Sequence, residues 1–200
     1  MIIIGITGPT GCGKTTLLRE IARRGGFCID CDALYYSMLR SNEALRSDLC
    51  GAFGNVFLPD GSLNRRALGS IVFQNEEKLQ LLDSIIFRHM GYEVERIICH
   101  EQYIGTKILA IDAIKLIECG FSRFCDATVA VLSPEEMRVQ RIMERDQIPE
   151  EYARSRIRAQ QPESFFRENC TYSIENTGTF SEFEENAKLF VDKLIKELQP

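Results

Sequence analysis

The first sixteen residues, MIIIGITGPTGCGKTT, constrain the fold of this chain more than any other stretch. The isoleucines of residues 2–6 form a short β-branched run, which predicts a strand buried on both faces. Residues 8–15 match the phosphate-binding pattern G-x-x-x-x-G-K-[ST], and residues 16–24 have the apolar spacing of a helix. This order predicts a three-layer α/β fold, in which helices cover both faces of a parallel sheet.

Residues 11–16 of this P-loop have predicted roles in binding a nucleotide. Its glycines let successive backbone N–H groups point at phosphate oxygens, and the helix that follows adds its own free N–H groups. Lys14 is expected to reach the β- and γ-phosphates, and the Thr15 hydroxyl to ligate Mg²⁺. Thr16 either binds the α-phosphate or only caps the helix. The predicted phosphate-binding residues are Gly11, Cys12 (through its backbone N–H), Gly13, Lys14, Thr15 and Thr16.

Acidic residues follow two further predicted strands. Asp30 and Asp32 come at the end of residues 27–30, and Asp112 ends residues 108–112. Ligands of open parallel sheets bind at the carboxyl ends of the strands. Asp32 is therefore a candidate general base, with an N-cap of the next helix as the alternative, whereas Asp30 is expected to support or cap. Asp112 is either a magnesium ligand through water or a simple cap.

The remaining pattern predicts an alternation of strands and helices. Further strands are expected at 127–132 and 171–175, and helices at 44–53, 64–73, 76–103, 114–119 and 180–198. Asn64 is expected to cap the second of these helices. Ser133, Pro134 and Glu136 predict a helix start with a capping box, in which Ser133 is the N-cap.

The chain is expected to form a single domain with three parts. The sheet-forming core comprises about 1–32, 106–137 and 168–200. The mostly helical residues 33–105 are too long for a simple crossover between strands and predict a subdomain that holds the acceptor substrate. Residues 138–167 are expected to form a lid.

Arginines dominate the predicted lid, in which Arg141 and Arg145 lie four residues apart on one helix face. One interpretation is a solvated pair of helices with salt bridges between interleaved charges. The other is a lid that closes over ATP, because arginine supplies paired donors to phosphate oxygens.

Composition restricts the partners. A net charge of −5 and a pI near 5.2 argue against a general nucleic-acid binder. No apolar run approaches the roughly 20 residues of a membrane span, and the start lacks the features of a signal peptide. The eight cysteines, including Cys28 and Cys31, are expected to stay reduced in a cytoplasmic protein. The expected partners are small molecules, and the expected assembly is a monomer or small homo-oligomer.

With these motifs placed, the chain resembles the dephospho-CoA kinase family of P-loop kinases nearly from end to end. The segments CIDCD, DGSLNRR and LIECG are similar to motifs of that family. The resemblance implies that Asp32 is the catalytic base, that Arg65 and Glu118 contact the acceptor, and that Arg145 is the catalytic arginine of the lid. It also implies ATP and Mg²⁺ as cofactors.

The last segment of the resemblance, IENTG, implies that Asn176 and Gly178 lie beside the adenine of ATP. The implied reaction transfers the γ-phosphoryl group of ATP to the ribose 3′-hydroxyl of dephospho-CoA. Where the family has a His-Pro pair, this chain has the residues 86–89 (IFRH), and the family's Pro-Leu pair is replaced by residues 114–115. Two alternatives therefore remain, namely a nucleoside or nucleotide kinase with an altered acceptor site, and an ATP-binding regulatory protein without transfer activity.

Overall fold

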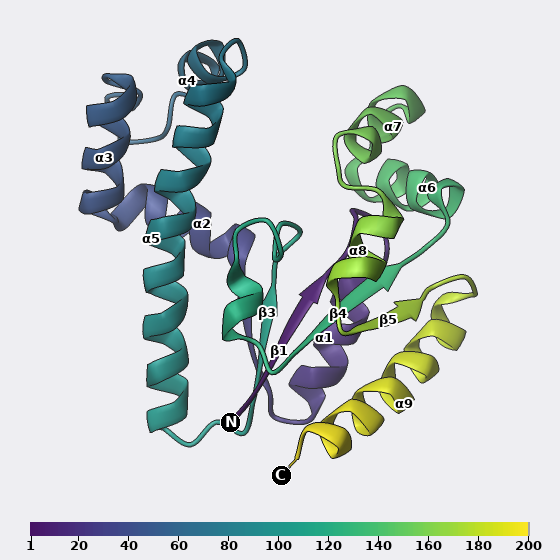
Figure 1. The fold of residues 1–200 in the computed structure, drawn as a ribbon. Coiled ribbons are helices and arrows are strands. Elements are labelled where there is room, and N and C mark those ends of the chain that lie inside the picture. Colours follow the sequence, from purple (N-terminus) through teal and green to yellow (C-terminus); the bar gives the residue numbers. More distant parts are fainter. Residues whose placement is uncertain (200) are drawn as a thin grey trace. The chain divides into compact units, whose positions relative to one another are not determined.

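A five-stranded sheet forms the centre of one of two compact units in the structure, a computed structural model that describes residues 1–199. The strand order is β2-β3-β1-β4-β5, so β1 lies in the middle (Figure 1). β1 pairs in parallel with β3 and β4, and β4 pairs in parallel with β5. The strands are β1 Ile2–Thr7, β2 Phe27–Asp30, β3 Ile108–Asp112, β4 Ala127–Leu132 and β5 Tyr172–Glu175. The predicted strands are confirmed, with ends shifted by at most one residue.

Helices cover both faces of this sheet, which explains why all six residues of β4 are buried. Ile6 of β1 belongs to one apolar cluster with Leu17 of α1 and Phe183 of α9. On the other face, Leu132 of β4 packs with Phe166 of α8. The helices of this unit are α1 Lys14–Arg23, α6 Glu135–Asp146, α7 Glu150–Arg158, α8 Glu163–Asn169 and α9 Phe180–Leu198, with the 3-10 turn η1 Phe121–Phe124.

The second compact unit, Asp30–Ile97, is mainly helical. Its helices are α2 Cys31–Ser41, α3 Glu43–Phe53, α4 Arg65–Val72 and α5 Glu76–Tyr103, whose last residues belong to the first unit. Asn64 caps α4 by accepting a hydrogen bond from the Ala67 N–H, at 3.0 Å, as the sequence predicts. Even the 28-residue α5 is not apolar enough to cross a bilayer, and the same holds for every helix within residues 1–199.

Two predictions of local structure are wrong. Residues 114–119 form turns, because the single helical bond from the Cys119 N–H to the Lys115 carbonyl is followed by Gly120 at φ +71°. Ser133 does not cap α6, whose N-cap is Pro134 without a side-chain bond. The Ser133 hydroxyl instead donates to the backbone carbonyl of Asn176 at 2.7 Å, a partner that no local pattern could predict.

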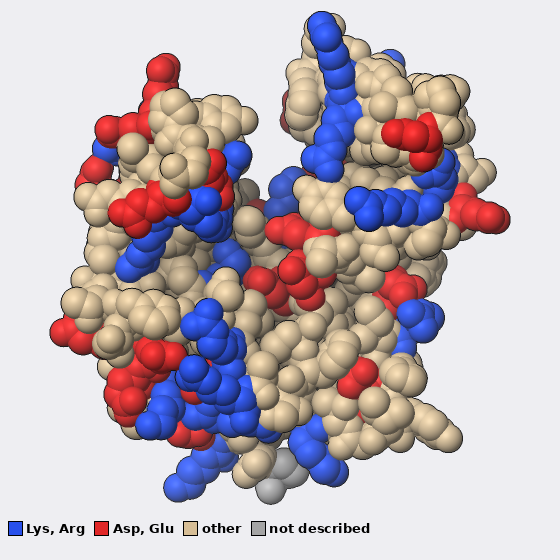
Figure 2. Space-filling model, turned by 180° about the vertical axis from the view of Figure 1, so that it is seen from behind, with Lys and Arg blue, Asp and Glu red and all other residues tan. Residues whose placement is uncertain are grey.

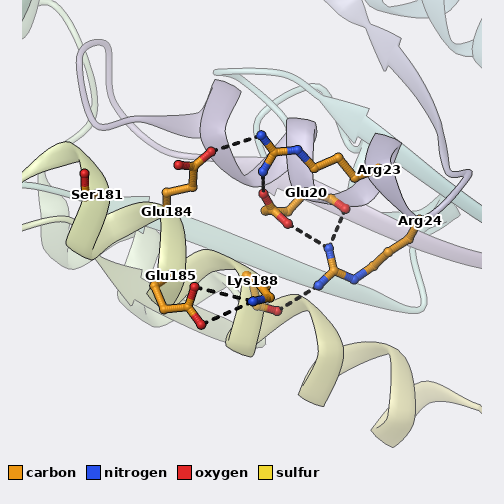
Figure 3. A pocket seen from close by; sticks show the side chains of 7 residues that line it. All are labelled: Glu20, Arg23, Arg24, Ser181, Glu184, Glu185 and Lys188. Atoms are coloured by element: carbon orange, nitrogen blue, oxygen red, sulfur yellow. Dashed lines mark hydrogen bonds and ion pairs between the residues drawn. The ribbon is translucent and has the colours of Figure 1, made fainter.

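A charged cluster joins α1 to α9 on the surface of the sheet-forming unit. Glu20, only 2% exposed, accepts hydrogen bonds from Arg23 and Arg24 (Figure 3). Arg23 also pairs with Glu184, and Arg24 pairs with Asp192 at 2.7 Å. On the face of the molecule shown in Figure 2, positive and negative side chains are interspersed. The buried carboxylate of Glu20 is therefore fully paired.

Glu20→Gln is expected to lower the free energy of unfolding by about 1–3 kcal/mol at pH 7, since it removes a buried, charge-assisted set of hydrogen bonds. The bond from Arg24 lowers the pKa of Glu20 in the folded state. Such a carboxylate stabilises the fold above its ordinary pKa of about 4.3, and this contribution disappears as the pH falls through the folded-state pKa. Denaturant titrations at several pH values measure the difference between wild type and variant.

The matched control is Glu184→Gln, which removes the partly exposed partner of Arg23 and should cost at most about 0.5 kcal/mol. A loss in Glu20→Gln that is equally large at pH 3 and pH 7 would contradict the electrostatic account.

Candidate active site

The P-loop connects the end of β1 to the start of α1 and depends on three glycines with positive φ. Gly8, Gly11 and Gly13 have φ values of +130°, +81° and +102°. A Cβ atom on Gly8 would lie 2.2 Å from the Val131 carbonyl oxygen, and one on Gly13 would lie 2.4 Å from Asn176 Nδ2. Both the backbone conformation and the close approach therefore require glycine.

The two side chains expected to contact phosphate and metal lie at the start of α1. Lys14 Nζ donates to the backbone carbonyl of Gly8 at 2.8 Å and that of Pro9 at 3.5 Å. The ammonium group thus folds back over the loop that precedes it. Thr15 is exposed, whereas Thr16 is buried and its N–H bonds to the Gly13 carbonyl at 3.0 Å. Of the two threonines, only Thr15 has a side chain that is open to a ligand.

Cys12 occupies the middle of the loop with only 1% of its surface exposed. Burial raises the pKa of its thiol, although Lys14 and Arg138 act in the opposite direction. The thiol is therefore protonated at neutral pH and is a poor nucleophile. This environment agrees with a role for Cys12 that is limited to its backbone.

Side chains from distant segments bind the outside of the P-loop. Asn176, 5% exposed, donates from Nδ2 to the Cys12 carbonyl at 2.9 Å. Arg141 donates to the Gly11 carbonyl at 3.2 Å and also to Asn176 Oδ1 and Ser133 Oγ, each at 3.1 Å. The structure therefore brings Arg141 and Asn176, both predicted nucleotide contacts, together at the loop backbone.

Gly178 lies two residues beyond Asn176 and lines a surface pocket of about 540 Å³. A Cβ atom on Gly178 would lie 2.5 Å from Oε2 of Glu182, which forms a capping box with Thr179 at the start of α9. Phe183 supplies an apolar wall to the same pocket. The carboxylate of Glu182 therefore occupies the space beside Gly178 that a side chain would need.

Asp112 is the last residue of β3, the strand that pairs with β1. The P-loop starts at the end of β1. The parallel register pairs Asp112 of β3 with Ile6 of β1. Its half-buried carboxylate thus belongs to the edge of the sheet at which the loop begins. Glu118, in the turns that follow β3, is exposed.

Arg145 lies near the end of α6 and is largely exposed. It forms a bidentate pair with Asp146 at 2.7 and 2.9 Å, and Arg156 of α7 binds the same carboxylate. These partners lower the pKa of Asp146 to about 2. Arg145 therefore has an anionic partner within the predicted lid, and its contact with phosphate stays a prediction.

The two helices of the predicted lid, α6 and α7, also pack through a small apolar cluster. Its buried members are Val139, Ile142, Ala153 and Ile157. Arg154 of α7 pairs with Glu136 of α6 at 2.7 Å and with Glu150 at 2.8 Å. The predicted salt-bridged helical pair is thus confirmed for α6 and α7, while Arg141 of α6 contacts the P-loop.

The helical unit carries two of the predicted acceptor-side residues, Asp32 and Arg65. Asp30 is the N-cap of α2 and accepts a hydrogen bond from the Ala33 N–H at 2.9 Å, as expected. Asp32 lies exposed in the first turn of α2, so the alternative that Asp32 is the N-cap is wrong. Tyr36 lies one turn further on, and the Arg65 guanidinium stacks over its ring at 5.0 Å. Arg65 thus lies beside the helix that carries Asp32.

Two residues of the site lack a signal in the sequence. The local pattern predicts Ser133 as a cap, but its hydroxyl bonds to Asn176 and Arg141. Gln160 matches no motif, yet its side chain bonds to Thr10 of the P-loop. The contacts of Ser133 with Asn176 and of Gln160 with Thr10 join segments more than 40 residues apart and depend on tertiary packing, so no local pattern reveals them.

Comparison with known proteins gives a consistent result. A family model described as dephospho-CoA kinase matches residues 2–182. A dephospho-CoA kinase of Corynebacterium efficiens is 32% identical, with 99% of this chain and 98% of that protein covered. The crystal structure of TT1252 from Thermus thermophilus is also 32% identical, with a TM-score of 0.76 and coverage of 100% and 98%.

A dephospho-CoA kinase structure from Campylobacter jejuni shares the fold, with a TM-score of 0.70 at 20% identity and 98% of each chain covered. Shikimate kinase from Acinetobacter baumannii, at 16% identity, has a TM-score of 0.52 over all of this chain and 96% of its own. The fold is therefore that of a P-loop kinase, as the strand–loop–helix order predicts. Together with the family match over residues 2–182, these findings show that the chain belongs to the dephospho-CoA kinase family.

Proposed function

We propose that this chain carries out the reaction of its family with its P-loop, its lid and Asp32. The reaction is the ATP-dependent phosphorylation of the ribose 3′-hydroxyl of dephospho-CoA, which yields coenzyme A and ADP. The observation that carries the proposal is the family match over residues 2–182, a range that contains every residue to which we assign a role. The chain is accordingly an ATP-dependent kinase of coenzyme A synthesis.

The P-loop binds the phosphates of ATP in this proposal. The backbone N–H groups of Gly11, Cys12 and Gly13 and the start of α1 supply partial positive charge for the phosphate oxygens. Lys14 exchanges the Gly8 carbonyl, its present partner at 2.8 Å, for the β- and γ-phosphates. The pocket at Gly178 receives the adenine, and Asn176 maintains the loop beside it.

The acceptor side depends on the helical unit. Asp32 accepts the proton of the ribose hydroxyl as that oxygen attacks the γ-phosphorus atom, and ADP leaves. Arg65 binds the acceptor near Asp32, and Glu118 contributes from the turns after β3. Arg145 exchanges Asp146 for the transferring phosphoryl group when the lid closes, and closure excludes water that would otherwise hydrolyse ATP.

The residues present fit a Mg²⁺ ion bound together with ATP. The open hydroxyl of Thr15 and the carboxylate of Asp112 are hard oxygen donors of the kind that Mg²⁺ prefers. Such sites usually take only one or two protein ligands, with phosphate and water oxygens completing the octahedron. The ion would neutralise charge on the β- and γ-phosphates. Thr15 would bind it directly and Asp112 would orient its water.

The test is ADP production by the purified protein with Mg·ATP, measured with dephospho-CoA, with a panel of nucleosides and nucleotides, and without acceptor. We expect strong stimulation by dephospho-CoA and phosphate incorporation at its 3′-position. Stimulation by a nucleoside instead would identify the alternative small-molecule kinase. Binding of ATP without stimulation by any acceptor would support the regulatory alternative and overturn the proposal.

The proposal places the enzyme in the cytoplasm, where ATP is available and thiols are kept reduced. No disulfide joins any of the eight cysteines, all of which lie within residues 1–199, and this is consistent with that compartment. Burial raises the pKa of both Cys119 and Cys125 to about 12, so these thiols are protonated at neutral pH and slow to oxidise.

A further inference from the structure

The side chain of Gln160 forms a reciprocal pair of hydrogen bonds with Thr10 of the P-loop. The Thr10 N–H donates to Gln160 Oε1 at 2.9 Å, and Gln160 Nε2 donates to Thr10 Oγ1 at 2.8 Å. Both residues are partly buried, although 150 positions separate them in the chain. Gln160 lies between α7, which ends at Arg158, and α8, which begins at Glu163.

This pair completes a set of contacts along three consecutive loop residues. Gln160 binds Thr10, Arg141 binds the Gly11 carbonyl and Asn176 binds the Cys12 carbonyl. The three side chains come from three different segments. Among these three, Gln160 alone comes from the connection between the second lid helix and α8, so its bonds join that connection to the loop backbone.

The chemistry of the pair suits positioning better than direct binding of phosphate. A glutamine amide is uncharged, and both of its polar atoms are already engaged by Thr10. The Thr10 N–H is likewise used by Gln160 and does not contribute to the phosphate-binding N–H groups. The pair fixes the peptide plane at Thr10 and limits the conformations of the glycine-rich residues that follow.

We propose that Gln160 is a positioning residue that preorganises the P-loop for ATP and couples the α7–α8 connection to nucleotide affinity. The proposal rests on the proposed function, since it takes the loop to be the ATP site. A loop held in its binding conformation before ATP arrives loses less conformational entropy on binding. Removal of Gln160 should therefore weaken ATP binding more than it slows the chemical step.

The experiment measures the affinity for a fluorescent ATP analogue without acceptor, and KM for ATP and kcat with acceptor. Gln160→Ala is expected to weaken analogue binding and raise KM for ATP about tenfold, with kcat changed less than about threefold, because two hydrogen bonds to the loop are lost. The matched control is Gln161→Ala, which removes an adjacent, exposed residue of the same type. It should leave all three quantities within about twofold of wild type.

A double-mutant cycle with Thr10→Val tests whether the pair is the cause. Thr10→Val and Gln160→Ala should each weaken binding, and the double variant should be little worse than Gln160→Ala alone. Thr10→Ser, which retains the hydroxyl, should recover most of the affinity lost in Thr10→Val. Melting temperatures within a few degrees of wild type establish that the variants are folded.

Two outcomes separate the claims. Provided that wild type binds the analogue, the inference about Gln160 is overturned if Gln160→Ala binds the analogue as tightly as Gln161→Ala does. It is also overturned if the fold-loss of affinity in the double variant equals the product of the losses in the two single variants. If folded wild type binds no ATP analogue, the proposed function itself fails.

Discussion

Asp32→Asn is expected to reduce kcat by about 10²–10⁴-fold while KM for ATP changes little. General base catalysis contributes a factor of this size, and an amide cannot accept the proton of the attacking hydroxyl. Asn is nearly isosteric with Asp, and Asp32 lies exposed in the first turn of α2, whose N-cap is Asp30. The change should therefore affect chemistry without disturbing the fold.

The measurement is steady-state kinetics with dephospho-CoA as acceptor, together with ATP binding at equilibrium. Asp30→Asn is the matched control, because it makes the same change two residues earlier. Asp30 caps α2, and Asn is an equally good N-cap, so this control should retain kcat within a few-fold and full stability. If Asp32→Asn retains more than about a tenth of the wild-type kcat, Asp32 does not supply the catalysis expected of a general base.

Gly8→Ala is expected to destabilise the protein by about 3–6 kcal/mol, enough to leave much of the chain unfolded at 37 °C. The new Cβ atom would lie 2.2 Å from the carbonyl oxygen of Val131, and Gly8 has φ +130°. The oxygen belongs to β4, a fully buried strand that pairs with both β1 and β5. Because β4 is paired on both sides, the Val131 carbonyl oxygen cannot shift away from the new Cβ atom. The P-loop or the adjoining edge of the sheet must therefore be displaced.

Chemical denaturation compares wild type with Gly8→Ala and with the control Gly25→Ala. Gly25 also has a positive φ, of +76°, but no atom lies within 4 Å of the position that a Cβ atom would take there. The control therefore measures the destabilisation caused by a non-glycine residue at positive φ alone, about 1–2 kcal/mol, without the steric clash. Equal destabilisation in the two variants would show that the contact with Val131 is not a constraint on the loop.

The elements that the sequence predicts well are those specified by neighbouring residues. The assignment of residues 2–16 to a strand, a P-loop and the start of a helix is confirmed, because the apolar run, the glycines and Lys14 each act over a few positions. Asp30 and Asn64 are confirmed as caps, since an N-cap bonds to the backbone three residues on. The long apolar spacing of 76–103 likewise matches α5.

The predictions that fail depend on competition between local and distant partners. Ser133 has the local context of a capping box, yet its hydroxyl bonds to the Asn176 carbonyl, 43 residues away. The short apolar segment 114–119 lacks the length to propagate a helix against the left-handed Gly120. Neither outcome can be predicted from a short stretch of sequence, because a local preference for a helix or a cap contributes less free energy than a buried tertiary hydrogen bond.

The class of this protein can be inferred from its primary structure, since the P-loop pattern and the ordered motifs after it specify a phosphate-binding α/β kinase. The contacts that hold the loop in place, in contrast, depend on the packed fold. Gln160, Arg141 and Asn176 reach Thr10, Gly11 and Cys12 from 130 to 164 positions away. Their side chains meet the loop because the parallel sheet brings the ends of distant strands to one edge, and that arrangement exists only once the core has packed.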